Sequence, residues 1–398
     1  MDEGGRSSEN AGLAVVLAGC FSDREVDPDA FLARHYSMVG WAKAVLEAGA
    51  RSVALVQRFR RDAIVRRDGV DYHFVSDDDA SLASSRFWGS NVTTAIRRLK
   101  PTAVHVDGLV FPLVVRHLRV TLPRRTSILV QDHGGVPSVL DSFRGWPKRA
   151  FYRFGLGGAD AFLFTAREQA APWVRAGIIG GGHAVHEIPE SSTNMGSWPV
   201  LAQGQSSLPG RPALLWVGRL ESNKDPLTVL EGFRQTTNAL PDAALTLAYD
   251  GEDLLSEVQS RIAKSSELRD RVHLRGFVDQ RAMPTLYAGA DLFILGSHRE
   301  VACFALIEAL SFGVTPIVTD IAAFRAITGR GRVGTLFTPG NAGMLARAIE
   351  RASHGDLATR RESVRAYFES ELSWAVVGRR ALDIYRAAVA SRSRKLSA

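Results

Sequence analysis

The sequence predicts an α/β protein built from two doubly wound, Rossmann-like halves. Three observations support this: a length of 398 residues, short apolar runs that alternate with amphipathic segments, and a turn-rich stretch at 191–212. An ordinary domain holds roughly 100–200 residues, so the length favours two domains. Strands that alternate with helices through short connections favour parallel sheets covered by helices.

The apolar runs and the segments of helical spacing place the elements of each half. In the first half the predicted strands are 13–17, 52–56, 103–106, 127–130 and 161–164, and the predicted helices are 36–48, 91–99, 111–118 and 167–176. In the second half the predicted strands are 213–217, 244–249, 272–275, 292–295 and 315–318, and the predicted helices are 226–236, 254–264, 283–288, 305–311 and 344–352. We expect an N-terminal domain over 1–195, a C-terminal domain over 210–372, and a ligand cleft between the carboxyl ends of the two sheets.

Composition excludes several classes of protein. Hydrophobic residues make up 45% and charged residues 23%, which is ordinary globular usage. The net charge is +7, but the basic residues are spread along the chain, so we expect no nucleic-acid partner. Two cysteines give no disulfide framework and favour a reducing cytoplasm. No apolar run reaches the roughly 18–20 residues that span a bilayer, and Leu17-Ala18-Gly19-Cys20 is interpreted as the end of a buried strand rather than a cleavage site.

The loop after strand 213–217 has the residue types that bind an anion. Gly218 allows a ligand to approach the backbone closely, and Arg219 and Lys224 place two cations beside the start of helix 226–236. Unpaired backbone N–H groups at a helix N-terminus also favour anions. A diphosphate suits this loop, although the same residues also occur in solvated loops.

The loop after strand 292–295 supplies two carboxylates. Glu300 precedes a helix expected to begin near Cys303, and Glu308 falls on the second turn of that helix. Ionised carboxylates accept hydrogen bonds from paired hydroxyls, so one could face a sugar and the other a ribose. The free N–H groups of the first helical turn suit a departing diphosphate.

Seven short motifs follow one another through the second half. In chain order they are the loop Gly218-Arg219 to Lys224, Asp250-Gly251-Glu252, Gly276-Phe277-Val278, residues 283–291, Glu300 and Glu308 with seven residues between them, Glu308-Ala309-Leu310 leading to Gly313-Val314-Thr315-Pro316, and Phe368 to Trp374 before a helix. Together they resemble family 4 glycosyltransferases. The resemblance implies a GT-B fold, with two Rossmann-like domains and a C-terminal helix at about 374–390 that crosses back onto the first domain.

The resemblance also implies roles for individual residues. Arg219 and Lys224 bind and neutralise the diphosphate of a nucleotide-sugar donor, with Gly218 beside them. Glu308 takes the ribose hydroxyls, Glu300 contacts the donor sugar, and the backbone near Val278 meets the base. The donor-binding set continues through the residues after Glu300, which are Ala302, Cys303 and Phe304. In the first half, Val130 to Gly135 resembles the strand-end histidine segment of these enzymes, and for His133 a place near the transferred sugar and a purely structural role both stay open.

Enzymes of this kind retain the anomeric configuration. The implied mechanism is same-face attack, in which a donor phosphate oxygen takes the acceptor proton, and it needs neither a metal nor another cofactor. The run Asp77-Asp78-Asp79 is interpreted as a solvated turn rather than a metal site. A Gly-x-Gly-x-x-Gly motif follows neither strand 13–17 nor strand 213–217, which argues against a nicotinamide enzyme.

The sequence also departs from the family pattern. The usual glycine-rich stretch after the first glutamate is Val301-Ala302-Cys303-Phe304-Ala305, and the usual Pro-Asn-Gly is Pro189-Glu190-Ser191. These changes keep a second interpretation open, namely a catalytically silent subunit or sensor that binds a nucleotide sugar without transferring it.

The expected partners are a nucleotide-sugar donor and a small-molecule, glycan or lipid-linked acceptor. Basic and aromatic residues mix in Arg58-Phe59-Arg60-Arg61, Arg66-Arg67 and Phe143 to Arg153. Such a mixture is typical of a surface that makes weak peripheral contact with a membrane, and equally of an Arg-rich solvated face. We expect a cytoplasmic protein, with contact at the inner face of the membrane as the open alternative.

Overall fold

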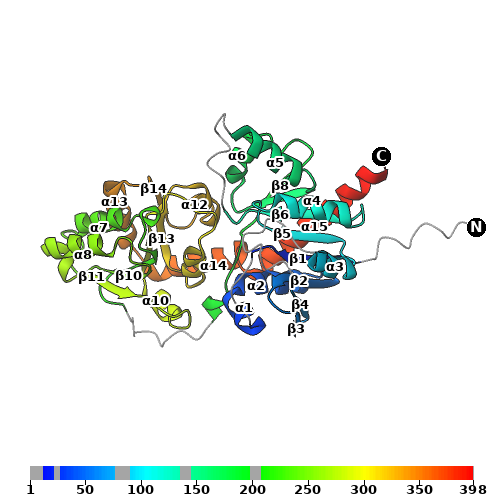
Figure 1. Ribbon diagram of the computed structural model, residues 1–398. Helices are drawn as coiled ribbons and strands as arrows, with labels where there is room; N and C mark the ends of the chain where they lie inside the picture. The colour runs from blue at the N-terminus through cyan, green and yellow to red at the C-terminus, as the bar shows by residue number, and fades with distance from the viewer. Residues whose placement is uncertain (1–11, 22–26, 77–89, 135–144, 198–207, 398) are drawn as a thin grey trace, which may run out of the picture. The chain divides into compact units, whose positions relative to one another are not determined.

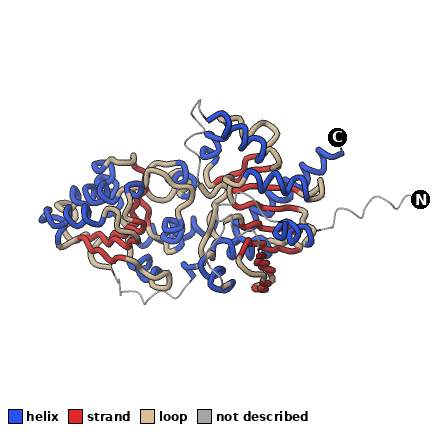
Figure 2. The backbone as a smooth tube through the Cα atoms, viewed as in Figure 1, coloured by secondary structure: helices blue, strands red, loops and turns tan. Residues whose placement is uncertain are grey.

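The computed structural model describes residues 12–21, 27–76, 90–134, 145–197 and 208–397, which form two compact units (Figure 1). Unit 1 comprises Met1–Ser191 with Trp374–Ala398, and unit 2 comprises Ser192–Ser373. Each unit holds one mainly parallel sheet with helices packed on it, as Figure 2 shows with strands in red and helices in blue. The predicted α/β class with two doubly wound sheets is confirmed.

The described strands of unit 1 follow the order β3-β4-β2-β1-β5-β6-β7-β8. Their bounds are β1 Ala14–Gly19, β2 Ser52–Phe59, β3 Ala63–Arg67, β4 Val70–Ser76, β5 Ala103–Asp107, β6 Ser127–Gln131, β7 Ala161–Phe164 and β8 Ala184–Glu187. Neighbours pair in parallel, except that β3 runs antiparallel to β4. Because β2 and β5 flank β1 on opposite sides, the order reverses there, and such switch points are where doubly wound sheets bind ligands.

Helices cover both faces of this sheet, which is why β1 is buried along its whole length. The helices are α1 Pro28–Arg34, α2 Tyr36–Glu47, α3 Ser90–Arg98, α4 Pro112–Thr121, α5 Trp146–Leu156, α6 Ala171–Arg175 and α15 Trp374–Ser397. The C-terminal helix α15 belongs to unit 1 and packs on α2. A Cβ placed on Gly378 of α15 would lie 2.3 Å from the carbonyl oxygen of Ala44, so the two helix backbones are in direct contact there.

The described strands of unit 2 follow the order β11-β10-β9-β12-β13-β14, all in parallel. Their bounds are β9 Ala213–Arg219, β10 Ala244–Asp250, β11 Val272–Gly276, β12 Leu292–Leu295, β13 Thr315–Thr319 and β14 Thr335–Phe337. The helices are α7 Pro226–Thr236, α8 Leu255–Lys264, α9 Ser266–Arg269, α10 Met283–Gly289, α11 Phe304–Ser311, α12 Ala322–Ile327, α13 Ala342–Ser353 and α14 Leu357–Glu371. The switch point of this sheet lies between β9 and β12.

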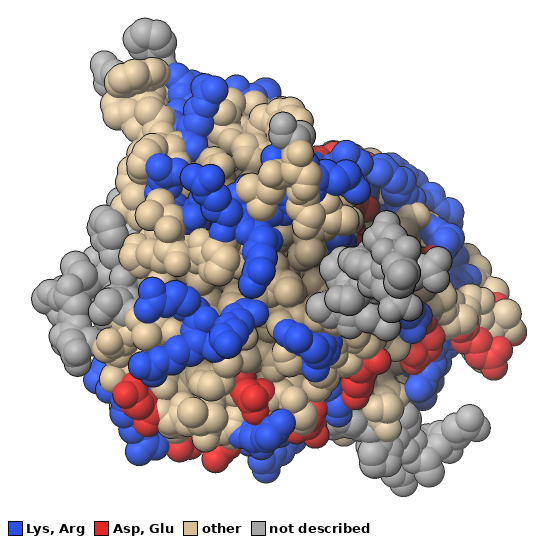
Figure 3. Space-filling model, turned by 90° about the vertical axis from the view of Figure 1, so that its right-hand side faces the viewer, with Lys and Arg blue, Asp and Glu red and all other residues tan. Residues whose placement is uncertain are grey.

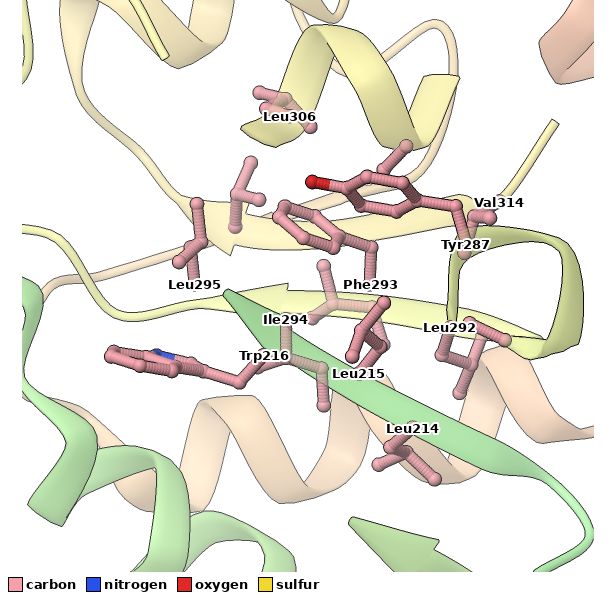
Figure 4. Close-up of a cluster of buried hydrophobic side chains, with 14 of the residues drawn as sticks. Leu214, Leu215, Trp216, Tyr287, Leu292, Phe293, Ile294, Leu295, Leu306 and Val314 are labelled. Atoms are coloured by element: carbon pink, nitrogen blue, oxygen red, sulfur yellow. The ribbon is translucent and has the colours of Figure 1, made fainter. Parts of the chain in front are cut away.

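The core of unit 2 forms around β9 and β12. Figure 4 shows Leu214, Leu215 and Trp216 of β9 beside the four residues of β12, with Tyr287 of α10 and Leu306 of α11 above them. All these side chains are buried. Burying apolar area stabilises the fold by roughly 25 cal/mol per Å², so this cluster fixes the two strands whose carboxyl ends lead into the candidate site.

The observed elements follow the predicted ones closely. The predicted strands 161–164 and 292–295 and the predicted helix 226–236 have the observed bounds. The predicted helix 167–176 is instead a short 3-10 turn, Arg167–Ala170, followed by α6. Asp77 to Asp79 lie outside the described residues.

Two further features bear on the chain as a whole. Both cysteines, Cys20 and Cys303, are free and buried. In the described part of the chain, none of the helices combines the length and the apolarity that a membrane span requires.

Candidate functional site

The N-terminal cap of α7 determines the conformation of the loop between β9 and α7. Asp225 adopts the left-handed conformation at φ 44° and ψ 57°, and its side chain accepts a hydrogen bond from the backbone N–H of Thr228. Pro226 follows at the first helical position, where its missing N–H costs nothing. A single 3-10 turn, Ser222–Lys224, precedes this cap. The sequence therefore fixes where the chain leaves β9 and where Lys224 lies.

The loop after β12 is fastened to this first loop. The backbone N–H of His298 donates to the carbonyl oxygen of Asn223 at 2.8 Å, and the side-chain amide of Asn223 donates to the carbonyl oxygen of Arg299 at 3.0 Å. His298 Nε2 lies 2.9 Å from Asp225 Oδ2. These contacts join segments more than 70 residues apart in the chain and hold Glu300 beside Lys224.

Lys224 and Glu300 form an ion pair between Nζ and Oε1. Their side chains are only 15% and 10% exposed. Burial lowers the pKa of Lys224, but nearby Cys303 and Glu300 raise it by more than burial lowers it. The pKa is therefore above the ordinary value, and the ammonium stays charged at neutral pH. Since the Cys303 thiol is itself neutral at that pH, Glu300 is the partner that supports the charge.

Glu308 lies on the second turn of α11 and is buried, with 8% of its surface exposed. The hydroxyl of Tyr287 donates to its Oε2 at 2.8 Å. Cys303 reports on the whole group: burial, Glu300 and Glu308 raise the pKa of its thiol to about 12, while Lys224 lowers it. Lys224, Glu300 and Glu308 therefore all lie within electrostatic reach of Cys303, at the switch point of the sheet.

The other predicted donor-binding residues lie around this group. Gly218 is next to Lys224, because a Cβ placed on it would lie 3.6 Å from Lys224 Cδ. Arg219 differs from the expectation of a paired cation, since its side chain is 67% exposed and its guanidinium pairs with Glu221 at 3.1 Å. Val278 follows β11, the outer strand two positions from β9. Ala302 and Phe304 flank Cys303 at the start of α11, and Phe304 is 37% exposed.

Unit 1 contains a cavity of about 190 Å³ at the carboxyl ends of β1, β5 and β6. His133 lines it, between two carboxylates: its Nε2 pairs with Asp107 Oδ1 and its Nδ1 with Glu190 Oε1. Burial lowers the pKa of His133, but Asp107 and Glu190 raise it well above the ordinary value. Burial raises the pKa of Asp107, and His133 more than offsets this, so that carboxyl is ionised. At neutral pH His133 is therefore an imidazolium.

A second histidine of the same cavity is neutral. The pKa of His105 falls to about 4, chiefly because the ring is buried. Its Nδ1 lies 2.7 Å from the hydroxyl of Tyr385, and the indole N–H of Trp41 donates to that hydroxyl at 2.9 Å. The tyrosine O–H therefore points to His105 Nδ1, which accepts. This chain of bonds ties β5 to α2 and α15 directly beneath the cavity.

Several residues of these sites were not singled out by sequence reasoning as site residues. Tyr287, Glu190 and Gln131 appear only inside motif comparisons, and Asp107 and Trp41 are not singled out. Asp107 and Gln131 end β5 and β6, so their position at strand ends was the available signal. Glu190 pairs with a residue 57 positions away, a relationship that local pattern does not reveal.

Comparison with known families identifies the C-terminal region. Residues 202–369 match the model of the family described as glycosyl transferases group 1. This region belongs to the group 1 glycosyl transferases. It covers nearly all of unit 2, including Lys224, Glu300 and Glu308, and it confirms the resemblance to family 4 glycosyltransferases drawn from the sequence motifs.

Curated relatives of this group 1 glycosyl transferase region match over part of their length. Mannosylfructose-phosphate synthase of Agrobacterium fabrum is 31% identical over 157 residues, which are 36% of this chain and 34% of the relative. GDP-mannose:cellobiosyl-diphosphopolyprenol alpha-mannosyltransferase of Xanthomonas campestris is 27% identical over 184 residues, 46% of this chain and 48% of the relative. The matched region thus spans between a third and a half of these two proteins.

The fold has close counterparts among solved structures. Sucrose-phosphate synthase of Thermosynechococcus elongatus superposes with a TM-score of 0.68, covering 95% of this chain and 100% of the other at 18% identity. Likeness at this level of identity shows the fold alone. The GT-B fold expected from the sequence is confirmed.

Proposed function

We propose that the protein is a retaining glycosyltransferase that moves a sugar from a nucleotide-diphosphate donor to a hydroxyl acceptor. The observation that carries the proposal is the group formed by Lys224, Glu300 and Glu308 at the switch point of unit 2. It lies in the region that belongs to the group 1 glycosyl transferases. One charged amine beside two carboxylates matches a ligand that joins a diphosphate to a pentose and a hexose.

The proposed roles follow from this chemistry. The ammonium of Lys224 neutralises the diphosphate, and Arg219 leaves Glu221 to join it when the donor binds. Glu308, with one oxygen held by Tyr287, accepts the ribose hydroxyls, and Glu300 contacts the donor sugar. The N–H groups at the start of α11 stabilise the negative charge that grows on the leaving group. The base lies near Val278.

The proposed reaction proceeds on one face of the sugar. The bond from the anomeric carbon to the diphosphate oxygen breaks, a bond from that carbon to the acceptor oxygen forms, and the acceptor proton passes to a donor phosphate oxygen. Atoms and charge balance without a metal or a further cofactor. Since His133 is already an imidazolium between Asp107 and Glu190, its role in unit 1 is that of a fixed positive group and not of a general base.

A thermal-shift panel tests the donor site. The intact protein is melted with UDP, GDP, dTDP, ADP and the corresponding sugar nucleotides, alongside Glu308→Ala and the control Glu362→Ala on the exposed face of α14. We expect one nucleotide series to raise the Tm of the wild type and of Glu362→Ala, and Glu308→Ala to lose most of that gain. Stabilisation by none of these nucleotides would overturn the proposal.

Activity separates a transferase from a silent subunit. The stabilising sugar nucleotide is incubated with a broad acceptor panel, and products are detected by mass, with the anomeric configuration read by NMR. An α-linked product from an α-linked donor supports retention. Binding without donor hydrolysis or transfer would favour a subunit that only holds the nucleotide sugar.

Contact of unit 1 with an acidic membrane surface is a separate part of the proposal. Helix α5 exposes Trp146 and Phe154, which are 68% and 59% accessible, and carries Lys148, Arg149 and Arg153. Figure 3 shows one face of the molecule with Lys and Arg side chains spread across it in blue. Exposed aromatics among cations are typical of interfacial helices. Arg58 is buried and takes no part, and Phe143 and Arg144 lie outside the described residues.

Vesicle sedimentation tests that contact. The protein is sedimented with vesicles of neutral lipid and with vesicles that contain acidic lipid, at low and at high salt. We expect binding to acidic vesicles that weakens with salt and with Trp146→Ala. Equal behaviour on the two kinds of vesicle would contradict it.

A further inference from the structure

The cavity of unit 1 has an unusual balance of charge. Among the described residues that line it, Asp107 and Glu190 are acidic, and neither lysine nor arginine is present. His133 supplies one positive charge, so Asp107, Glu190 and His133 together carry one net negative charge, and His35 is the third histidine of the lining. His105 is neutral, because burial lowers its pKa to about 4. A ligand with its own negative charge would therefore meet repulsion in this cavity.

Gln131 brings an unpaired polar group to the lining of the cavity. The side chain lines the cavity at the end of β6 and is 3% exposed. Its Nε2 is buried, and in the described part of the chain it has no hydrogen-bond partner. A buried donor left unpaired costs about 1–3 kcal/mol, and buried amide groups are nearly always satisfied. The oxygen of a ligand hydroxyl would satisfy this donor.

The carboxylates of Asp107 and Glu190 can accept further hydrogen bonds. Asp107 and Glu190 each direct one oxygen to a nitrogen of His133. An ionised carboxylate offers about four acceptor sites on its two oxygens and donates none, so the remaining sites can accept from the hydroxyl or ammonium groups of a ligand. This arrangement suits a ligand that donates hydrogen bonds to the carboxylates from one edge and accepts a hydrogen bond from Gln131 at another. Ring compounds bearing several hydroxyls have that pattern.

The size of the cavity limits the ligand further. A cavity of 150 Å³ is known to hold one benzene ring, and this one has about 190 Å³. Its lining residues include Trp41 of α2, which is buried, and Phe21, which is half exposed. The volume thus suits one six-membered ring with its substituents, resting against apolar rings.

We propose that this cavity receives the acceptor as a single unphosphorylated, polyhydroxylated six-membered ring, neutral or amino-substituted, and disfavours its phosphorylated form. The inference rests on the proposed function, because it names the acceptor of the same transfer. Glu190 and Gln131 are its specificity-determining residues: Glu190 supplies the negative charge that repels a phosphate, and Gln131 supplies the donor for a ring oxygen. The ring hydroxyl that is to be glycosylated lies beside the imidazolium of His133.

Binding of four matched probes tests the proposal. Glucose, glucosamine, glucose 6-phosphate and glucosamine 6-phosphate are titrated into the full-length protein by saturation-transfer NMR, with the stabilising nucleotide diphosphate present. We expect each unphosphorylated ring to bind at least about tenfold more tightly than its phosphate, a difference of 1.4 kcal/mol. Tighter binding of glucosamine than of glucose identifies an amino-substituted acceptor, and equal binding identifies a neutral one.

Two variants connect the preference to the cavity. Glu190→Gln should reduce the difference in affinity between each unphosphorylated ring and its phosphate. Gln131→Met should weaken the binding of all four probes by a similar factor. Glu187→Gln, an exposed carboxylate at the end of β8, should change nothing. Melting curves show that each variant is folded, and the two variants act through different groups, so one failure of folding leaves the other as a test.

The contrary outcomes are distinct. The inference is overturned if the phosphates bind as tightly as the plain rings, if none of the four binds, or if neither variant alters the pattern. In all three cases the rise in Tm with nucleotide, and the loss of that rise in Glu308→Ala, still test the donor site independently. The proposed function fails separately, when no nucleotide stabilises the wild type.

Discussion

The Nζ of Lys224 is paired with the Oε1 of Glu300 across 76 positions of sequence, between the loops that follow the two central strands of unit 2. Each side chain is largely buried, so the pair depends on its own attraction rather than on solvent. Breaking such a pair by removing one partner leaves an unmatched charge behind. The pair therefore holds the two loops together, and a bound diphosphate would give Lys224 a second negative partner.

Lys224→Ala is expected to lower kcat by about 10²–10³, which is the usual effect of removing one group that stabilises transition-state charge. The measurement is steady-state transfer with the donor identified by thermal shift. Lys264→Ala, at the exposed end of α8, is the matched control and should keep full activity.

The double variant Lys224→Ala/Glu300→Ala separates catalysis from folding. It should recover part of the stability that Lys224→Ala loses, because no buried charge is left unmatched, while activity stays low. Full activity in the double variant would show that the pair serves structure alone.

Gly296→Ala is expected to disturb the same loops through the backbone. An added Cβ would lie 2.9 Å from the carbonyl oxygen of Asp225 and 3.3 Å from that of Lys224, closer than such atoms normally approach. The loop must shift, which moves Glu300 away from Lys224. We expect a lower Tm and a loss of nucleotide stabilisation, measured together in one thermal-shift series.

Gly251→Ala is the control for that substitution. No neighbouring atom lies within 4 Å of a Cβ at that position, although its φ of +75° makes any side chain strained. It should therefore lower the Tm without removing the response to nucleotide. If Gly296→Ala kept the full response, close packing at this point would not position the site.

The parts of the fold that the sequence predicted are those with strong local patterns. β12 and β7 are fully buried apolar runs, and α7 has a capping aspartate followed by proline. The hairpin of β3 and β4 escaped prediction because it is an edge structure: β3 reads Ala-Ile-Val-Arg-Arg, and its Ile64 is 71% exposed. An edge strand need not bury one face, so periodicity gives little signal there.

The site divides in the same way. Lys224, Glu300 and Glu308 could be named because each lies in a short motif next to a strand end. The two ion pairs of His133 could not be predicted, because Asp107 comes from β5 and Glu190 from the loop after β8. Nothing in the local sequence specifies a pairing between residues so far apart. Only the order of strands in the sheet brings them together.

His133 is expected to remain protonated above neutral pH. Its pKa lies well above 6.5 because Asp107 and Glu190 outweigh the effect of burial. A folded pKa above the unfolded one gives stability that is complete below pH 6.5 and is lost as pH rises through the folded value. An NMR titration of the ring Cε1–H should show no transition near 6.5, and Glu190→Gln should move the transition downward. A normal titration in the wild type would contradict the imidazolium.

The lowered pKa of His105 predicts that stability falls as the pH is lowered, which is the opposite of the effect expected from His133. The pKa of this ring is about 4 in the folded protein against an ordinary 6.5, because it is buried. Between these values the unfolded chain binds a proton that the folded protein does not, so the free energy of unfolding falls as the pH drops from 6.5 to 4. The lowered pKa corresponds to about 3 kcal/mol over that window. Stability from this source is complete above pH 6.5.

Urea unfolding at pH 7.5, 6.0 and 4.5 measures this dependence, with His105→Asn as the comparison. The variant keeps Asp107 and His133, which titrate nearby, so those groups contribute to both proteins. We expect the wild type to lose more stability than the variant between pH 7.5 and 4.5, although the variant is less stable at pH 7.5 because the contact with Tyr385 is gone. Equal losses in the two proteins would show that His105 takes up its proton at an ordinary pH, and that burial does not hold the ring neutral.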